Sequence, residues 1–186
     1  MRFGLKVAPL LIPAVLAITG CASTSYPPMT TVASVDVPGY MGAWYQQALI
    51  PNRFQSMCVA DTQALYELKS TGEITVTNRC RTESGQIEKA VGIAKAVEGS
   101  AGAKLKVSFF RPFYGDYWVL ALDPDASQGW VLVGEPSRKY AWIMSREPEL
   151  NKTSFESAMA QALSAGYTRE QFVTSPQRQP LEKALN

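Results

Sequence analysis

The sequence predicts an all-β fold, an eight-stranded antiparallel up-and-down β-barrel with one C-terminal α-helix packed outside it. Three observations predict this fold: short strand-like segments recur at regular spacing, turn residues separate them, and helical spacing occurs only near the C-terminus. The expected strands cover residues 42–50, 58–69, 73–82, 87–97, 104–110, 117–123, 130–135 and 140–146. The connections are short, which favours an antiparallel meander over βαβ units.

The alternation of side chains indicates which face of the sheet turns inward. In 58–69 and 73–82 the even positions are mostly apolar and the odd positions mostly polar or charged, so we expect the even residues inside. In 87–97, Lys89 and Lys95 occupy odd positions, and the even positions include four small residues. These small residues are Ala90, Gly92, Ala94 and Ala96. If they face inward they leave space for a ligand, as eight-stranded barrels can; the alternative places them on the outer face.

The helix is expected after residue 150, with Asn151 or Thr153 as its N-cap and Gly166 at its end. Apolar residues at helical spacing predict that one face packs on the barrel. These residues are Phe155, Met159, Ala162 and Leu163. The segment 176–186 is expected to be a loose tail.

The N-terminus has the layout of a secretory signal peptide over 1–20. Arg2 and Lys6 precede a charge-free apolar run, 7–18, which is shorter than the roughly 20 residues of a membrane-spanning helix. Small residues then lead to Cys21. The layout predicts export from the cytoplasm.

Ile18-Thr19-Gly20-Cys21 resembles a bacterial lipobox, in which the cysteine receives acyl chains and cleavage precedes it. The resemblance implies lipidation of Cys21, and three acyl chains anchor a protein firmly. Ala22 follows, not Asp, which in the bacterial sorting rule favours the outer membrane, facing the periplasm. We expect 21–37, rich in Ser, Thr, Pro and Ala, to be an acylated flexible tether, with the barrel and helix over 38–175.

Composition limits the classes of function. The chain has 18 basic and 16 acidic residues, and loss of Arg2 and Lys6 with the signal peptide leaves 16 of each, so nothing favours nucleic-acid binding. The sequence has no histidine, which excludes histidine as a general base or as a metal or haem ligand. We expect no cofactor, no metal site and no catalytic residue.

Cys58 and Cys80 remain once the anchor is set aside. An even pair in an oxidising compartment predicts a disulfide, with two unpaired buried thiols as the alternative. Both fall on the expected inner face, but a simple hairpin register would place them a few residues apart. A bridge therefore requires a bulge or a curled strand start.

Three segments carry a family resemblance. Gly42-Ala43-Trp44 opens the first strand, Leu105 to Asp123 forms a long central segment, and Tyr140 to Arg146 precedes the helix. Together they resemble the lipocalins, in particular the outer-membrane bacterial lipocalins related to apolipoprotein D. The resemblance implies that Arg146 packs across Trp44 and closes one end of the barrel.

The resemblance also implies a fatty acid or lysophospholipid ligand, bound for lipid storage, transport or envelope maintenance. The candidate wall residues are Gln46, Ala48, Tyr66, Val76, Asn78, Ala94, Phe109, Tyr117 and Trp142. Gln46 and Asn78 are the candidates to meet a polar head group. Two alternatives stay open: a structural or partner-docking lipoprotein, and an enzyme that uses a free Cys58 or Cys80 thiol. The chain is expected to be a monomer or a homodimer.

Overall fold

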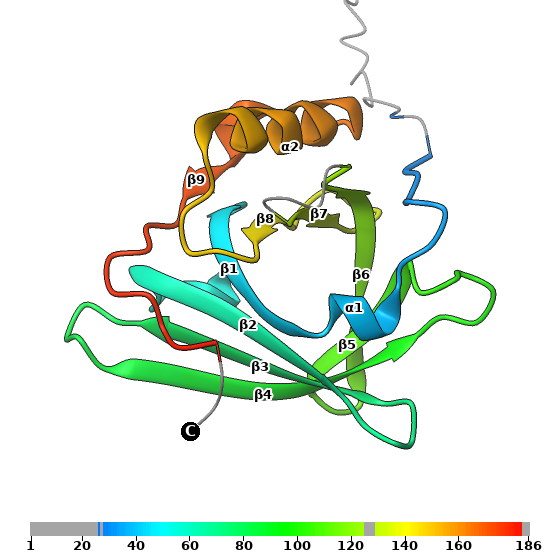
Figure 1. Ribbon diagram of the computed structural model, residues 1–186, viewed down its shortest axis with the longest axis horizontal. Helices are drawn as coiled ribbons and strands as arrows, with labels where there is room; N and C mark the ends of the chain where they lie inside the picture. The colour runs from blue at the N-terminus through cyan, green and yellow to red at the C-terminus, as the bar shows by residue number, and fades with distance from the viewer. Residues whose placement is uncertain (1–25, 27, 125–128, 184–186) are drawn as a thin grey trace, which may run out of the picture.

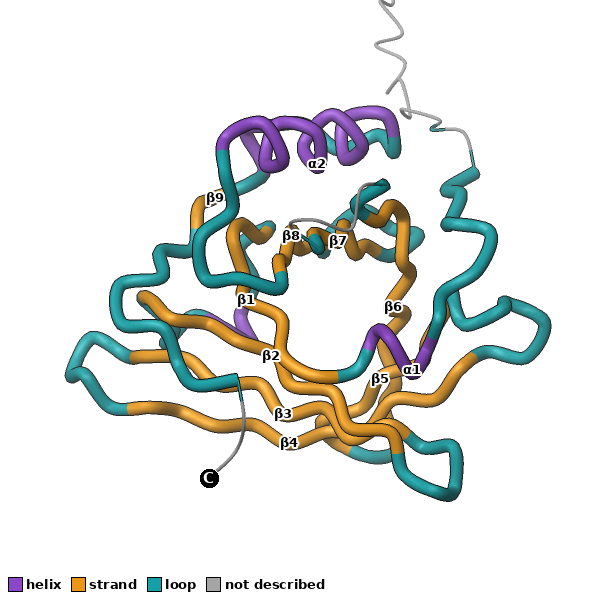
Figure 2. Tube along the Cα trace, viewed as in Figure 1, coloured by secondary structure: helices purple, strands orange, loops and turns teal. Residues whose placement is uncertain are grey.

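The computed structural model describes residue 26 and residues 28–124 and 129–183; the signal peptide and Cys21 lie outside the described residues. Figure 1 shows a β-barrel with one long helix against its side, and Figure 2 shows the same arrangement by element type. The elements are α1 (Val37–Tyr40), β1 (Gly42–Leu49), η1 (Arg53–Gln55), β2 (Ala60–Leu68), β3 (Ile74–Arg81), β4 (Ile87–Ala96), β5 (Lys104–Phe110), β6 (Phe113–Leu122), β7 (Trp130–Gly134), β8 (Ala141–Ser145), α2 (Lys152–Ser164), η2 (Arg169–Gln171) and β9 (Val173–Thr174).

The barrel closes because β1 pairs with both neighbours. Strands β2 to β8 follow one another in an antiparallel meander, and β1 joins β8 on one side and β2 on the other. The predicted eight-stranded antiparallel barrel is therefore confirmed, although β6 begins at Phe113, four residues before its predicted start. The two-residue β9 is an addition that the sequence did not indicate, and it pairs with the end of β1.

Two apolar clusters share the barrel wall. One lies on the inner face of the barrel and includes Trp44, Val76, Ala94 and Tyr117, all at most 9% exposed. The other lies between the wall and α2. Its members include Ala48, Leu132, Ile143, Ala158, Met159 and Ala162. Because side chains alternate along a strand, the same strands supply both clusters.

Of the two N-caps expected for helix α2, Asn151 is the one observed. The Asn151 side chain accepts a hydrogen bond from the backbone N–H of Ser154 at 2.9 Å. Gly166, with φ of +88°, follows the end of the helix in the left-handed region that favours glycine. Of the predicted apolar face, Met159 and Ala162 are buried, but Leu163 is 44% exposed and Ala158 takes its place.

The Cys58–Cys80 disulfide is confirmed, with the two Cα atoms 5.5 Å apart. The irregularity that such a bridge requires is present, because the β2–β3 register shifts between Ala60 and Gln63. Asp61 lies in this bulge with φ of +55°, a conformation that Asp tolerates better than most residues. The bridge fixes the loop before β2 to strand β3.

The segment after α2 differs from the expected loose tail. Residues 173–183, here called the strap, run along the barrel wall (Figure 1). Pairing between β1 and β2 ends at Tyr45 and Gln63. Beyond this point the strap bonds to both strands, through Ser175 N–H to the Gln47 carbonyl at 2.8 Å and Asp61 N–H to the Pro176 carbonyl at 2.9 Å. The strap therefore fills a gap between β1 and β2.

Part of the expected tether is also packed. The backbone N–H of Val32 donates to the Val119 carbonyl at 3.0 Å, and that of Val35 donates to the Ala101 carbonyl at 2.9 Å. Val32, Val35 and Val37 contact the interior cluster. Since these apolar side chains find partners, the ordered body begins before the predicted residue 38.

Candidate functional site

The end of the barrel crossed by α1 is closed by an arginine over a tryptophan. The Arg146 guanidinium carbon lies 3.8 Å from the centre of the Trp44 ring. Its nitrogens donate to the carbonyls of Gly39, Met41 and Ala43 at 2.5 to 3.1 Å. Arg146 and Trp44 therefore pack together as the resemblance implied. They close this end of the barrel, and Arg146 also provides hydrogen-bond donors for the three carbonyl groups there.

Above the sealed end, three tyrosine hydroxyls meet inside the barrel. The Tyr117 hydroxyl lies 2.7 Å from that of Tyr40 and 3.0 Å from that of Tyr66. Burial raises the pKa of all three well above its usual value, to about 12 for Tyr66. The hydroxyls therefore stay protonated. Three hydrogens serve two hydroxyl–hydroxyl bonds among the described residues, so one donor remains for a polar group or water inside the barrel.

The inner face of β3 and β4 becomes more accessible away from the sealed end. The cross-strand pairs place Val76 opposite Gly92 and Asn78 opposite Ala90, all on the inner face with Ala94. Ala94 and Val76 are at most 2% exposed, whereas Ala90 is exposed and Asn78 partly so. Ala94 thus faces inward as predicted, whereas the predicted Ala96 is exposed. The wall opens to solvent at the end that carries Ala90 and Asn78, which we call the mouth.

The expected space beside Gly92 is filled. A Cβ built on Gly92 would lie 2.6 Å from the Ser108 carbonyl oxygen and 2.8 Å from the Phe109 ring. Phe109 itself is 45% exposed. Glycine at this position therefore allows close approach of β5, and does not leave an empty cavity.

Ala48 is not on the ligand wall, so this prediction is wrong. A register shift between Gln46 and Ala48 in the β1–β8 pairing changes the face on which Ala48 lies. Ala48 packs instead in the cluster beneath α2. Beyond a bulge, the alternation of side chains no longer predicts which face of the strand a residue occupies.

Gln46 is buried, but its amide is bound within the protein and does not face an open head-group site. Its nitrogen donates to the Ser175 hydroxyl at 3.0 Å, and its oxygen accepts from the Gln55 side chain at 2.9 Å. The Gln55 oxygen in turn accepts from the Trp142 indole N–H at 2.8 Å. This chain links the loop after β1 to β8 and the strap.

The sequence missed two residues of this arrangement. Tyr40 precedes the first strand, and Gln55 lies in the loop after it, so strand alternation applies to neither. Tyr40 lies four residues before Trp44, and the Trp44 indole N–H donates to the Tyr40 carbonyl at 2.9 Å. This short spacing is the one local feature of the sequence that could have placed Tyr40 beside Trp44.

The described residues offer little for other chemistries. Within residues 28–124 and 129–183, no cluster of acidic or cysteine side chains is arranged to hold a metal ion. Cys58 and Cys80 are bridged, so the thiol on which the enzymatic alternative depends is not free. Among the helices that the structure describes, none combines the length and apolar character needed to span a membrane.

Comparison with known proteins identifies relatives of the sequence. Residues 35–177 match the model of the "Lipocalin-like domain" family. The chain is 42% identical over 106 residues to temperature-induced lipocalin-1 of Arabidopsis thaliana, a match that covers 52% of this chain and 56% of that one. It is 39% identical over 93 residues to the outer membrane lipoprotein Blc of Vibrio cholerae serotype O1, covering 50% and 54%. These matches span little more than half the length of the relatives.

Solved structures support the fold alone, since their sequences are distant. Lobster apocrustacyanin A1 matches with a TM-score of 0.60 at 19% identity, over 81% of this chain and 90% of that one. Insecticyanin from the tobacco hornworm Manduca sexta matches with a TM-score of 0.64 at 20% identity, over 82% and 86%. Each match extends over about four fifths of this chain.

Proposed function

The chain belongs to the lipocalin-like family, whose model matches it over most of its length, and on this basis we propose that the barrel binds a hydrophobic ligand. The ligand we propose is a fatty acid or a lysophospholipid, held for lipid storage, transport or envelope maintenance. Each methylene that leaves water for an apolar wall contributes about 0.8 kcal/mol. An acyl chain therefore suits an interior lined by Val76, Ala94 and Val119.

The observation that carries this proposal is the gradient of exposure along the inner face of β3 and β4. Apolar residues line the sealed base, and the exposed Ala90 lies near the mouth. The Tyr40–Tyr66–Tyr117 hydroxyls add a neutral donor at depth for one polar group. A ligand with one long apolar chain and few polar atoms fits this lining.

The identity of the ligand can be tested on protein extracted from its native membrane without added lipid. We expect native mass spectrometry to find a bound fatty acid or lysophospholipid. Titration of delipidated protein with either lipid should also change the tryptophan emission, because Trp142 packs against the interior cluster. An empty barrel that takes up neither lipid in titration would contradict the proposal.

Blocking the mouth should weaken lipid binding without disturbing the core. Ala90→Trp places a large side chain at an exposed inner position, so we expect lipid affinity to fall at least about tenfold, the loss of about 1.4 kcal/mol of buried contact. The control is Lys89→Trp, because Lys89 is also exposed but faces outward one residue earlier. Equal affinities of the two variants in lipid titration would argue against the barrel as the binding site.

We further propose that the protein is anchored to the outer membrane, facing the periplasm, through acyl chains on Cys21. The lipobox-like residues 18–21 and the outer membrane lipoproteins among the relatives support this location. Cys21→Ser should remove the anchor, so fractionation should move the protein from the outer-membrane fraction to soluble or inner-membrane material. Ser25→Ala, in the same segment, should leave the fractionation unchanged. Retention of the Cys21→Ser protein in the outer membrane would contradict the anchor.

A further inference from the structure

A small pocket lies on the outer wall of the barrel, where β5 separates from β4. Pairing between these strands ends at Ile93 and Ser108, although β4 extends back to Ile87. The pocket has a volume of about 200 Å³. Its lining includes Lys69, Thr75, Ile93, Ser108, Phe109 and Arg111. Strands β3 and β4, which supply part of this lining, lie on the side of the barrel opposite α2 (Figure 1).

The floor of this pocket carries a hydroxyl that has no partner among the described residues. Thr75 pairs with Ile93 and Ile93 with Ser108, so the three side chains share the outer face. Ser108 is only 4% exposed, and its hydroxyl forms no hydrogen bond within the described part of the chain. A buried hydroxyl without a partner is costly, which points to a bound polar group as its natural acceptor.

The rim of the pocket has more positive than negative charge. Three cations share one carboxylate: Glu73 lies 4.0 Å from Lys69, 3.8 Å from Lys95 and 3.6 Å from Arg111. The distances are long, and no second carboxylate pairs with these cations among residues 28–124 and 129–183. By contrast, the nearby Lys106 is neutralised by Asp116 at 2.7 Å. The cluster therefore has an excess of two positive charges.

Exposed aromatic side chains adjoin the basic rim. Phe110 is 75% and Phe113 71% exposed, and their rings stack with centroids 6.2 Å apart on either side of Arg111. Val91, in the pocket lining, is 55% exposed. A free inorganic anion gains nothing from contact with this apolar surface, whereas the acyl region of a lipid can pack against it.

We propose that this outer pocket binds the head group of an anionic phospholipid, with the phosphate between Lys69, Arg111 and the Ser108 hydroxyl and the acyl region against Phe110 and Phe113. The site is separate from the barrel interior and goes beyond the ligand proposed above. It would hold the β3–β5 wall of the protein against a membrane surface that carries negative charge.

The test measures binding to vesicles of phosphatidylcholine alone and to vesicles in which part of it is replaced by phosphatidylglycerol. The full chain with Cys21→Ser is used throughout, so that acyl chains do not contribute. We expect a preference for the anionic vesicles. Lys69→Gln/Arg111→Gln should reduce that preference about twentyfold, since each cation near an anionic surface contributes about fivefold.

The control pair is Lys152→Gln/Arg169→Gln, which removes the same charge on the α2 side and should leave the preference within about twofold. Ser108→Ala should melt no lower than the parent, because it removes an unpartnered hydroxyl, and yet should lose the preference about tenfold. The mouth-blocking Ala90→Trp should keep the preference, which separates this site from the barrel ligand.

If the two double variants lose the same preference for anionic vesicles, net charge alone explains the binding and the proposed site is wrong. A normal preference in Ser108→Ala would also overturn the role of the pocket. Inorganic phosphate is titrated as a separate arm. If phosphate binds with the same dependence on Lys69 and Arg111 while vesicles show no preference, the lipid assignment is wrong.

Discussion

Arg146→Ala should lower the free energy of unfolding by about 3 kcal/mol, with a matching fall in the urea midpoint. The change removes the cation from the face of Trp44 and leaves the carbonyls of Gly39, Met41 and Ala43 without their donor. These carbonyls run from α1 through Met41 to the start of β1, so the arginine ties α1 to the first strand at the end of the barrel. Urea titrations followed by the total tryptophan emission measure this loss.

Two variants sharpen this result. Arg146→Lys keeps the charge, but a single ammonium cannot reproduce a planar fork that contacts a ring and three carbonyls, so we expect an intermediate loss. Arg169→Ala removes an arginine from an exposed ion pair with Glu156 and should change stability little. If Arg146→Ala and Arg169→Ala lower the free energy of unfolding by similar amounts, the Arg146–Trp44 pair contributes no more to stability than an exposed ion pair.

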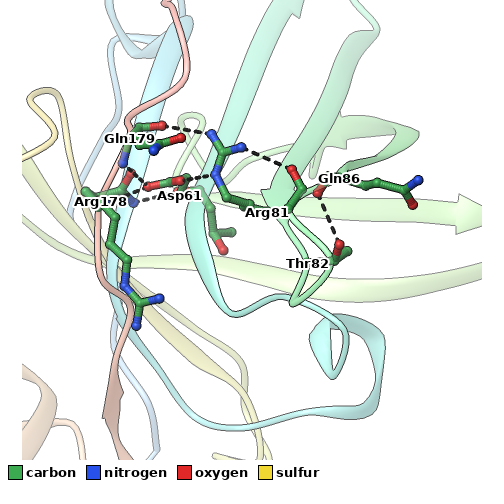
Figure 3. Close-up of polar contacts among 9 residues, drawn as sticks. Asp61, Arg81, Thr82, Gln86, Arg178 and Gln179 are labelled. Carbon is green, nitrogen blue, oxygen red and sulfur yellow. Dashed lines mark hydrogen bonds and ion pairs between the residues drawn. The ribbon is translucent and has the colours of Figure 1, made fainter.

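Asp61→Ala should also cost about 3 kcal/mol, because it removes a fully buried carboxylate and takes away the acceptor of one Arg81 N–H and of two backbone N–H groups of the strap. Figure 3 shows the carboxylate between the Arg81 side chain and the strap. It accepts from the Arg81 guanidinium and from the backbone N–H groups of Arg178 and Gln179 at 2.6 to 2.8 Å. Hydrogen exchange should show rapid opening of the strap in this variant.

The same carboxylate predicts a pH dependence. Burial alone would raise the pKa of Asp61, but the hydrogen bonds from Arg81, Gln179 and Arg178 and the charge of Arg81 hold it below its ordinary value. Its contribution to stability is therefore complete above the unfolded pKa of about 3.9 and is lost as the pH falls through the lower folded pKa.

Urea titrations over a range of acidic pH measure this loss, with Asp61→Asn as the control. Asparagine tolerates the same left-handed backbone and lacks the charge, so its stability should vary less with pH in that range. Parallel pH profiles for the parent and Asp61→Asn would refute the assignment to Asp61.

The sequence predicted the barrel well because strand alternation and turns are local signals. All eight strands were placed, and the inward positions of Val76 and Ala94 follow from the period of two. The positions that failed are those where a local rule is interrupted. The shift after Gln46 moved Ala48 to the outer face, and no pattern in the sequence marks that shift.

Other features depend on contacts between distant residues, which one sequence does not reveal. The Tyr40–Tyr117 hydroxyl bond joins residues 77 positions apart, and the Asp61 contacts with the strap join residues more than 110 apart. Residues 176–183 of the strap fall in the segment 176–186 that was predicted to be a loose tail. Its order comes from hydrogen bonds to groups exposed where β1 and β2 separate.

The position of the strap has a consequence for the order in which the molecule assembles. Strand β1 is made early, but its pairing partners β8 and β9 come roughly a hundred or more residues later. The gap between β1 and β2 is filled only when residues 175–183 are available. Contacts this distant form late and slowly, so the ends of β1 and β2 that separate stay uncovered until residues 175–183 have been synthesised, even after β1 has paired with β8 and closed the barrel.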